Sequence, residues 1–168
     1  MKTNVVYMSK TGNTEKLAKE IFNTIPGKDK DIREFEVNHQ SSEGDIYFVG
    51  FWVNRGTCSM DLLEYLSGLH QKKIAIFGTC GMGSDEAYYK RIEDNIQVWL
   101  PEDCEYAGAF LCQGKMPMSV RDKYTEMLGS GKDERQIQQM IQNFDQGMTH
   151  PDKQDLSRMR EFVQQVLA

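Results

Sequence analysis

The segment from Ser9 to Thr14 concentrates hydrogen-bonding groups in six residues near the start of the chain. It consists of Ser9, Lys10, Thr11, Gly12, Asn13 and Thr14. Gly12 allows a tight turn, and a helix that begins here would present free backbone N–H groups to a phosphate. The segment therefore predicts a phosphate-binding loop, although the same residue types also cap helices and form turns without any ligand. The sequence contains neither a Walker A loop nor a G-x-G-x-x-G fingerprint.

A second candidate segment follows the apolar run at residues 46–51. It consists of Trp52, Val53, Asn54, Arg55 and Gly56. An aromatic residue followed by polar and glycine positions suits contact with a flat ring, and Trp52 is the candidate for that contact. The alternative is that Trp52 packs in the core and Gly56 is an ordinary turn glycine. Arg55, like Lys10, could neutralise an anionic ligand or be an exposed cation.

The third candidate segment is glycine-rich and follows another apolar run. It consists of Thr79, Cys80, Gly81, Met82 and Gly83. Its two glycines would let the backbone approach a planar ligand closely. Cys80 and Cys58 could form a redox dithiol, but a reactive thiol needs an exposed electropositive site, and structural thiols are the simpler interpretation.

Alternating strands and helices must position these three segments. Apolar runs predict strands near residues 5–8, 32–37, 46–51, 73–79 and 106–111. Helical stripes lie between them, for example Tyr88, Ile92, Ile96 and Trp99. Such alternation implies right-handed parallel βαβ units in a doubly wound sheet. Because ligands bind beyond the carboxyl ends of such strands, the three segments should converge there.

The pattern changes to helices only after Gly114. Residues 115–149 carry two apolar helical stripes, and Pro151 is predicted to open a last helix. The 168 residues suit one domain. We therefore interpret residues 1–168 as one unit and 115–149 as a helical insertion. That insertion could roof a substrate site, dock a partner or simply pack against its own surface.

Composition excludes several function classes. The formal net charge of −5 argues against a nucleic-acid partner or a polybasic membrane binder. No apolar run reaches the ~18 residues of a membrane span, and the N-terminus lacks a signal-peptide pattern. Four dispersed cysteines and the scattered His39, His70 and His150 supply no zinc-ligand spacing. We therefore expect a cytoplasmic protein with reduced thiols and no metal.

The motif Ser-x-Thr-Gly-Asn-Thr after an N-terminal strand resembles the phosphate loop of flavodoxins. The order of elements, including the closing helix around residues 150–152, resembles that family over the whole chain. The resemblance implies a flavodoxin-like α/β fold, with five parallel strands in the order 2-1-3-4-5 and the extra helical segment after the fifth strand. It also implies that FMN is the cofactor and that residues 9–14 hold its 5′-phosphate.

The resemblance also assigns roles around the flavin ring. Residues 52–56 would cover one ring face, with the Gly56–Thr57 peptide turning its carbonyl to flavin N5, and residues 79–83 would bind the pyrimidine edge. Many flavodoxins place a tyrosine in this last loop, whereas Met82 and Gly83 stand here. Met82, Tyr88 or Tyr89 would cover the second face, or that face is open to substrate.

Two functions follow from the resemblance. The first is an electron carrier that shuttles low-potential electrons between a reductase and an acceptor enzyme. The second is an FMN-dependent reductase that acts directly on a quinone-like or tetrapyrrole substrate, since the chain also resembles flavodoxin-like proteins that accompany bilirubin reduction. A flavin-free binding module would remain if the ring contacts fail.

Overall fold

A five-stranded parallel sheet forms the centre of the computed structural model, which describes residues 1–38, 43–83 and 85–168. The strand order β2-β1-β3-β4-β5 confirms the order that the sequence predicts. The strands are β1 (Thr3–Tyr7), β2 (Lys30–Glu34), β3 (Ile46–Trp52), β4 (Lys73–Cys80) and β5 (Glu105–Gln113). The three inner strands are almost wholly buried, as expected when helices cover both faces of a parallel sheet.

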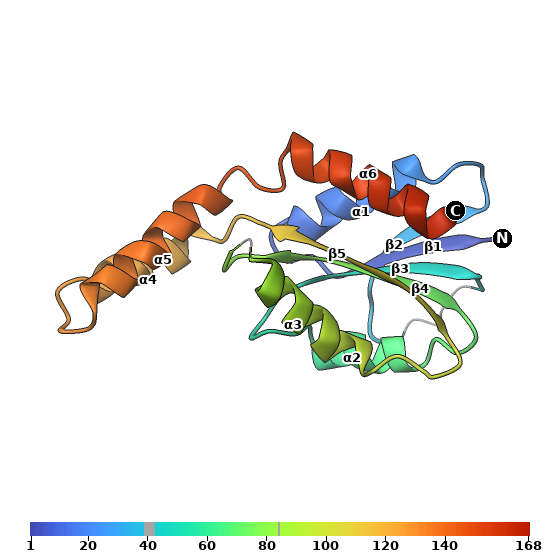
Figure 1. Ribbon diagram of the computed structural model, residues 1–168, viewed down its shortest axis with the longest axis horizontal. Coiled ribbons are helices and arrows are strands. Elements are labelled where there is room, and N and C mark those ends of the chain that lie inside the picture. The colour runs from blue at the N-terminus through green and yellow to red at the C-terminus, as the bar shows by residue number, and fades with distance from the viewer. Residues whose placement is uncertain (39–42, 84) are drawn as a thin grey trace.

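Helices cover both faces of the sheet (Figure 1). They are α1 (Asn13–Thr24), α2 (Met60–Ser67), α3 (Glu86–Gln97), α4 (Met118–Met127), α5 (Glu134–Gly147) and α6 (Lys153–Leu167). The pair α1 and α6 lies on one face, and α2 and α3 lie on the other. Among the described residues, no helix is both long enough and apolar enough to cross a membrane.

Two hydrophobic cores lie on the two faces because successive side chains of a strand point in opposite directions. Phe48 and Phe77 belong to the core beneath α1 and α6, and Phe51 belongs to the core above α2 and α3. Gly50 and Gly78 make room for these rings, since a β-carbon at either position would collide with Phe77 or Phe51. The cores thus fix the registers of β3 and β4, whose ends carry two of the candidate segments.

Several element boundaries differ from those that the sequence predicts, and the ends of β2 and α3 differ for reasons that the structure shows. Strand β2 ends at Glu34 rather than at Val37, because its partner β1 ends at Tyr7, opposite Glu34. Helix α3 ends at Gln97, and Trp99 lies beyond it on the surface instead of extending the apolar stripe.

The last helix also begins later than the sequence predicts. Pro151 does not open α6, which starts at Lys153 with Asp152 as its N-cap. Asp152 and Asp155 form a reciprocal capping box, in which each side chain accepts the backbone N–H of the other residue.

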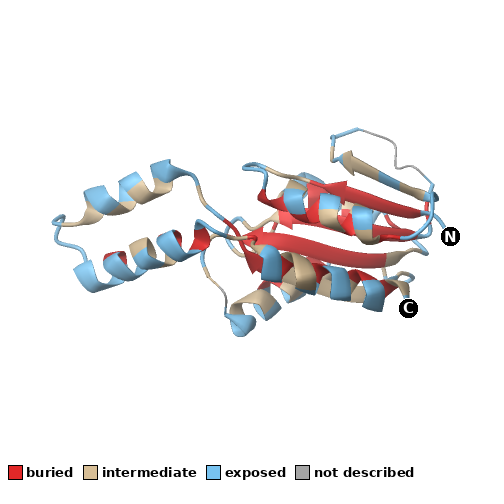
Figure 2. Cartoon of the chain, turned by 90° about the horizontal axis from the view of Figure 1, so that it is seen from above, coloured by how far each residue is buried: buried red, intermediate tan, exposed pale blue. Residues whose placement is uncertain are grey.

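Helices α4 and α5 form a hairpin that extends from the carboxyl end of the sheet (Figure 1). Most of its surface is exposed or intermediate, and α4 contains no buried residue (Figure 2). Ile137 and Phe144 of α5 are buried. An ion pair joins Arg121 of α4 to Asp145 of α5 at 2.9 Å. The segment predicted as a helical insertion is therefore a helical hairpin beside the edge where ligands bind in this class of sheet.

Candidate functional site

A cavity of about 410 Å³ lies at the carboxyl ends of the inner strands. Ten of the residues predicted from the sequence line it: Lys10, Thr11, Asn13, Thr14, Trp52, Val53, Asn54, Thr79, Gly81 and Met82. Six predicted residues do not line it: Ser9, Gly12, Arg55, Gly56, Cys80 and Gly83. The three candidate segments thus converge on one cavity, as parallel strands require, but each contributes only part of its residues.

The loop from Ser9 to Thr14 is held in shape largely by its own side chains. The Ser9 hydroxyl accepts the backbone N–H groups of Gly12 and Glu15, at 3.2 and 3.3 Å. The buried Thr14 hydroxyl donates to the Phe51 carbonyl at 3.2 Å and lies 3.1 Å from Thr79 Oγ1. Gly12 is the N-cap of α1, in the left-handed conformation, and supplies no capping side chain. Ser9 and Thr14 therefore shape the loop, and the exposed Thr11 lines the cavity.

Trp52 forms a wall of the cavity rather than part of either core. It is the last residue of β3 and is half-buried, and it belongs to neither core cluster. The Lys10 ammonium lies over its indole ring, 5.2 Å from the centroid, a cation–π contact. The alternative of a core tryptophan is therefore wrong, and an indole face borders the space where a planar ligand would lie.

A tight turn follows Trp52 at the mouth of the cavity. Asn54 and Thr57 exchange backbone hydrogen bonds of 2.8 and 3.2 Å across it. Arg55 and Gly56 have φ angles of 52° and 82°, the pattern of a type I′ turn. The Gly56 carbonyl accepts a hydrogen bond of 3.0 Å from Asn95 Nδ2 on α3. Arg55 and Gly56 therefore shape the turn, and only Asn54 of these residues lines the cavity.

Met82, not a tyrosine, borders the cavity on the side of β4. Met82 is 53% exposed, and Tyr88 and Tyr89 pack against the core between the sheet and helices α2 and α3. The Tyr89 hydroxyl donates to the Gly83 carbonyl at 2.7 Å, so this tyrosine stabilises the loop after β4. Among the three residues predicted as alternatives for the second ring face, only Met82 reaches the cavity.

One wall of the cavity comes from the chain after β5, at the start of the insertion for which the sequence left a roof over the site, a docking surface and simple packing as alternatives; its individual residues were not predicted as site residues. Its residues are Gly114, Lys115, Met116, Pro117, Ser119, Val120 and Lys123. The break in strand–helix alternation at Gly114 was the only available signal. Together with Lys10, this wall brings three lysines to the cavity, and no carboxylate is among the described residues that line it. The cavity is therefore cationic in a chain of net charge −5.

A chain of amide hydrogen bonds ties the hairpin to the loop after β4. Asn143 of α5 donates through Nδ2 to the Gly81 carbonyl at 2.9 Å. The buried Gln113 at the end of β5 donates through Nε2 to the Asn143 carbonyl at 3.1 Å. A β-carbon at Gly81 would collide with Met116, so the loop also packs directly on the hairpin's base. The hairpin thus fixes the position of one cavity wall.

The cysteines are buried or half-buried free thiols. Cys58, Cys80 and Cys112 are buried, and Cys104 is intermediate. Burial raises the pKa of the Cys58 and Cys80 thiols to about 12, because a thiolate loses its hydration inside the protein. The structure favours structural thiols over a reactive dithiol at Cys58 and Cys80.

A second, smaller and more polar cavity of about 280 Å³ adjoins the same loop. Thr11, Gly12 and Asn13 line it on one side. Lys16, Lys115 and residues 148–151 complete it. Thr11, Asn13 and Lys115 line both cavities, so the two spaces lie on either side of one wall. That wall is closed by a hydrogen bond of 2.8 Å from Asn13 Nδ2 to the Lys115 carbonyl.

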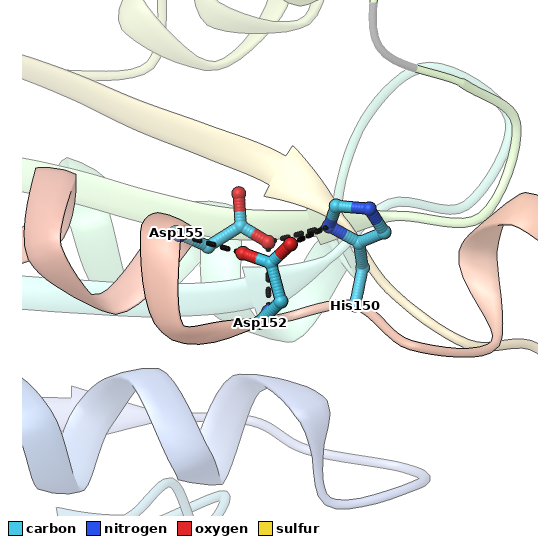
Figure 3. Close-up of side chains that lie close together, drawn as sticks. All are labelled: His150, Asp152 and Asp155. Atoms are coloured by element: carbon cyan, nitrogen blue, oxygen red, sulfur yellow. Dashed lines mark hydrogen bonds and ion pairs between the residues drawn. The ribbon is translucent and has the colours of Figure 1, made fainter.

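His150, at the rim of this polar cavity, belongs to a cluster with Asp152 and Asp155 (Figure 3). His150 Nδ1 lies 2.6 Å from Asp155 Oδ2, and Arg158 donates to Asp155 Oδ1 at 2.6 Å. Burial alone would raise the pKa of Asp155, but hydrogen bonds from the Asp152 backbone, His150 and Arg158 outweigh it and hold that pKa below its usual value. Because Arg158 and the capping box already occupy these carboxylates, we assign the cluster to helix capping rather than to a metal. His39 lies outside the described residues.

The sheet order and this cavity define an FMN-binding fold of the electron-transfer class. The model of the Flavodoxin domain matches residues 4–164, and the chain belongs to the flavodoxin family. FMN is therefore its cofactor, and the residues present fit that group: an indole wall for the ring, a loop at a helix N-terminus for the phosphate, and lysines around both.

Two curated relatives are similar over nearly their full lengths. A flavodoxin-like domain-containing protein BilS of Clostridioides difficile (strain CD3) is 36% identical, covering 99% of this chain and 97% of the relative. A protein of the same name from Clostridium symbiosum (strain WAL-14163) is 30% identical, covering 97% and 94%.

Solved structures support the fold. The flavodoxin of Streptococcus pneumonia TIGR4 superposes with a TM-score of 0.61 at 17% identity, covering 99% of this chain and 98% of that one. Oxidised Flavodoxin 2 from Bacillus cereus gives 0.60 at 15% identity, with the same coverage.

Proposed function

We propose that this protein is an electron carrier that takes low-potential electrons from a reductase and delivers them to an acceptor enzyme. The observation that carries the proposal is the cavity of about 410 Å³ at the carboxyl ends of the strands, whose walls are supplied by the cofactor segments and the hairpin base. FMN accepts one electron at a time when bound, and the protein supplies position and electrostatics.

The roles of the site residues follow from their positions. The loop 9–14 would hold the 5′-phosphate through backbone N–H groups and Thr11. Trp52 would cover one ring face, and Met82 and Met116 would border the other. Three residues hold these groups in position. Ser9 and Thr14 shape the phosphate loop, and Asn143 holds the loop after β4.

The partners and the compartment belong to the same proposal. The unpaired, buried thiols suit the reducing cytoplasm, where we place the protein. The hairpin adjoins the cavity and exposes Met118, which is 54% exposed, so it would be the natural contact for a redox partner protein. We propose no nucleic-acid, membrane or metal partner.

The test begins with the purified protein reconstituted with FMN. Bound FMN should give a yellow protein whose flavin fluorescence is quenched on binding. Mixed with NADPH alone, the complex should stay oxidised, and a separate reductase should be needed to bleach it. Absence of flavin binding would favour the flavin-free binding module, and rapid bleaching by NADPH alone would favour a direct reductase.

The direct reductase remains the second candidate because of one observation. Met82 is the only one of the three predicted ring-covering residues at the cavity, and it is 53% exposed. A methionine can move aside and leave a ring face open to a quinone-like or tetrapyrrole substrate. The relatives named BilS fit either function. Oxidation of the reduced complex by such a substrate, faster than by oxygen, would support this candidate.

The Gly56 carbonyl should tune the flavin's potential through Asn95. Because Asn95 holds this carbonyl toward α3, turning the Gly56–Thr57 peptide toward flavin N5 requires that hydrogen bond to break. Asn95→Ala should therefore ease reduction and raise the midpoint potential of the first electron by about 40 mV, the equivalent of ~1 kcal/mol. Redox titration measures it. Asn23→Ala, an exposed asparagine on α1, is the matched control and should leave the potential unchanged.

Removing the Asn143 side chain should loosen the wall at Gly81. Asn143→Ala deletes the bond to the Gly81 carbonyl and leaves Gln113 with one partner fewer. We expect FMN to bind about fivefold more weakly, from ~1 kcal/mol of lost hydrogen bonding. Fluorescence titration measures this, with Asn23→Ala again as control. Equal affinity in Asn143→Ala and the parent would show that the hairpin does not support the cavity.

A further inference from the structure

Two methionine side chains belong to the lining of the cavity at the carboxyl ends of the strands. Met82 is 53% exposed, whereas Met116 is half-buried. Two methionines outside this lining have nearly the same exposed fraction as Met82, since Met60 is 56% exposed and Met118 is 54% exposed. A difference in reactivity between Met82 and these two residues would therefore report its position at the cavity and not its access to bulk solvent.

The thioether of Met82 is open to a reaction that the neighbouring thiol resists. Oxidation of a thiol requires its thiolate, and burial raises the pKa of Cys80 to about 12. A methionine sulfur carries its lone pairs at every pH and needs no deprotonation before it is oxidised to the sulfoxide. Of the two sulfur atoms at the end of β4, the one in Met82 is therefore the one that peroxide can reach and oxidise.

The Tyr124 hydroxyl of α4 lies beside this sulfur. It donates to Met82 Sδ at 3.8 Å and so links the hairpin to the loop after β4. Burial raises the pKa of the Tyr124 phenol, so the hydroxyl keeps its proton at neutral pH. A thioether accepts hydrogen bonds only weakly, whereas a sulfoxide presents a polar oxygen. The same hydroxyl would therefore hold the oxidised side chain more firmly than the reduced one.

We propose that Met82 is an oxidation site for hydrogen peroxide, at which the sulfoxide forms beside the cavity and accepts the Tyr124 hydroxyl. The sulfur gives an electron pair to the new S–O bond while the peroxide O–O bond breaks. The departing hydroxide takes the proton of the transferred oxygen and leaves as water. FMN supplies the hydrogen peroxide when its reduced form meets oxygen. The inference rests on the proposed flavin binding and adds to it a modification site on the cavity wall.

The sulfoxide would change how the cavity holds a flat ring. A thioether is apolar and polarisable and packs well against an aromatic ring, whereas a sulfoxide loses hydration when a ring covers it. FMN should therefore bind about fivefold more weakly to the oxidised protein. Methionine sulfoxide reductases return the sulfoxide to the thioether, so the change in affinity would be reversible.

The first experiment compares the methionines of matched exposure within one sample. The protein loaded with FMN is cycled in air with NADPH and a separate reductase, and catalase removes peroxide that escapes into the solvent. Sulfoxide is measured by peptide mass spectrometry, and Met82 should be oxidised about threefold faster than Met60 or Met118. Hydrogen peroxide added to the flavin-free protein gives the baseline ratio that exposure alone produces. A ratio during cycling no higher than this baseline would overturn the inference.

The second experiment tests the effect of the sulfoxide on binding. The FMN dissociation constant is measured by fluorescence before and after peroxide treatment of the flavin-free protein. The parent should bind FMN about fivefold more weakly after treatment, and Met82→Leu, which cannot form the sulfoxide, should bind it equally before and after. Equal losses of affinity in the parent and in Met82→Leu would contradict the role of Met82.

The phenylalanine variant of Tyr124 tests the hydroxyl separately. Tyr124→Phe keeps the ring and removes the donor, so peroxide treatment should lower the melting temperature of this variant more than that of the parent. Equal losses would show that the hydroxyl does not hold the sulfoxide. Failure of the untreated parent to bind FMN would contradict the proposed function instead, whereas the melting temperatures, which need no flavin, would still decide the contact between Tyr124 and the oxidised Met82.

Discussion

Replacing Asp155 with alanine should lower the free energy of unfolding by about 3 kcal/mol at pH 7. The substitution leaves His150, the Arg158 guanidinium and the Asp152 backbone N–H without their acceptor. Breaking a buried, hydrogen-bonded charge cluster typically costs about 3–5 kcal/mol, and Arg158 is half-exposed, so the lower end applies. Urea denaturation followed by circular dichroism measures the change.

The effect of Asp155 should depend on pH in a defined direction. Its pKa is lower in the folded protein than in the unfolded chain, so folding favours the ionised carboxylate. Its contribution is therefore fully present above the unfolded pKa of about 3.9 and is lost as pH falls through the lower folded value. The parent and Asp155→Ala should differ most above about pH 5 and converge in strong acid. Asp122→Ala, an exposed aspartate of α4, is the control, and a comparable loss there would contradict the argument.

Replacing Trp52 with alanine should weaken FMN binding about thirtyfold. The indole face borders the ring space, and its removal would forfeit stacking and buried apolar area worth roughly 2 kcal/mol together. Trp52→Phe keeps an aromatic face and should lose only part of that affinity. Fluorescence titration with FMN measures both.

The second tryptophan of the chain provides the matched control. Trp99 lies on the surface beyond α3 and is not among the residues that line the cavity. Trp99→Ala should leave the FMN dissociation constant within about twofold of the parent value. If Trp52→Ala behaved like Trp99→Ala, the indole would not cover the ring, and the ring would have to lie against the methionine side of the cavity.

The sheet and the convergence of three loops were predictable because they depend on local patterns. Apolar runs such as Ile46 to Phe51 specify strands, and parallel topology then places every strand's carboxyl end on one edge. The end of β2 was not predictable, since the alternation through Val37 continues past the last partner residue of β1. Helical spacing likewise included Trp99, although α3 ends at Gln97, shortly before Pro101.

The walls contributed by the hairpin were not predictable for a different reason. An apolar stripe such as Val120, Tyr124 and Met127 indicates that one face of a helix is packed. It does not indicate where that helix lies relative to the sheet. The same limit applies to His150, whose role depends on Asp155 and Arg158 reaching it from the next helix. Sequence spacing suggested isolated histidines, whereas the turn before α6 brings one of them to the rim of the phosphate loop.

The burial of the cysteines keeps thiol oxidation apart from electron transfer by the flavin. Cys80 directly precedes a loop residue of the flavin cavity, yet burial raises the pKa of its thiol to about 12, so the thiol form prevails at pH 7. Thiolates, not thiols, react with peroxides and disulfides. A flavoprotein that generates peroxide when its reduced form meets oxygen would therefore keep this sulfur unoxidised. Repeated redox cycling in air should leave the thiol count of the folded protein unchanged.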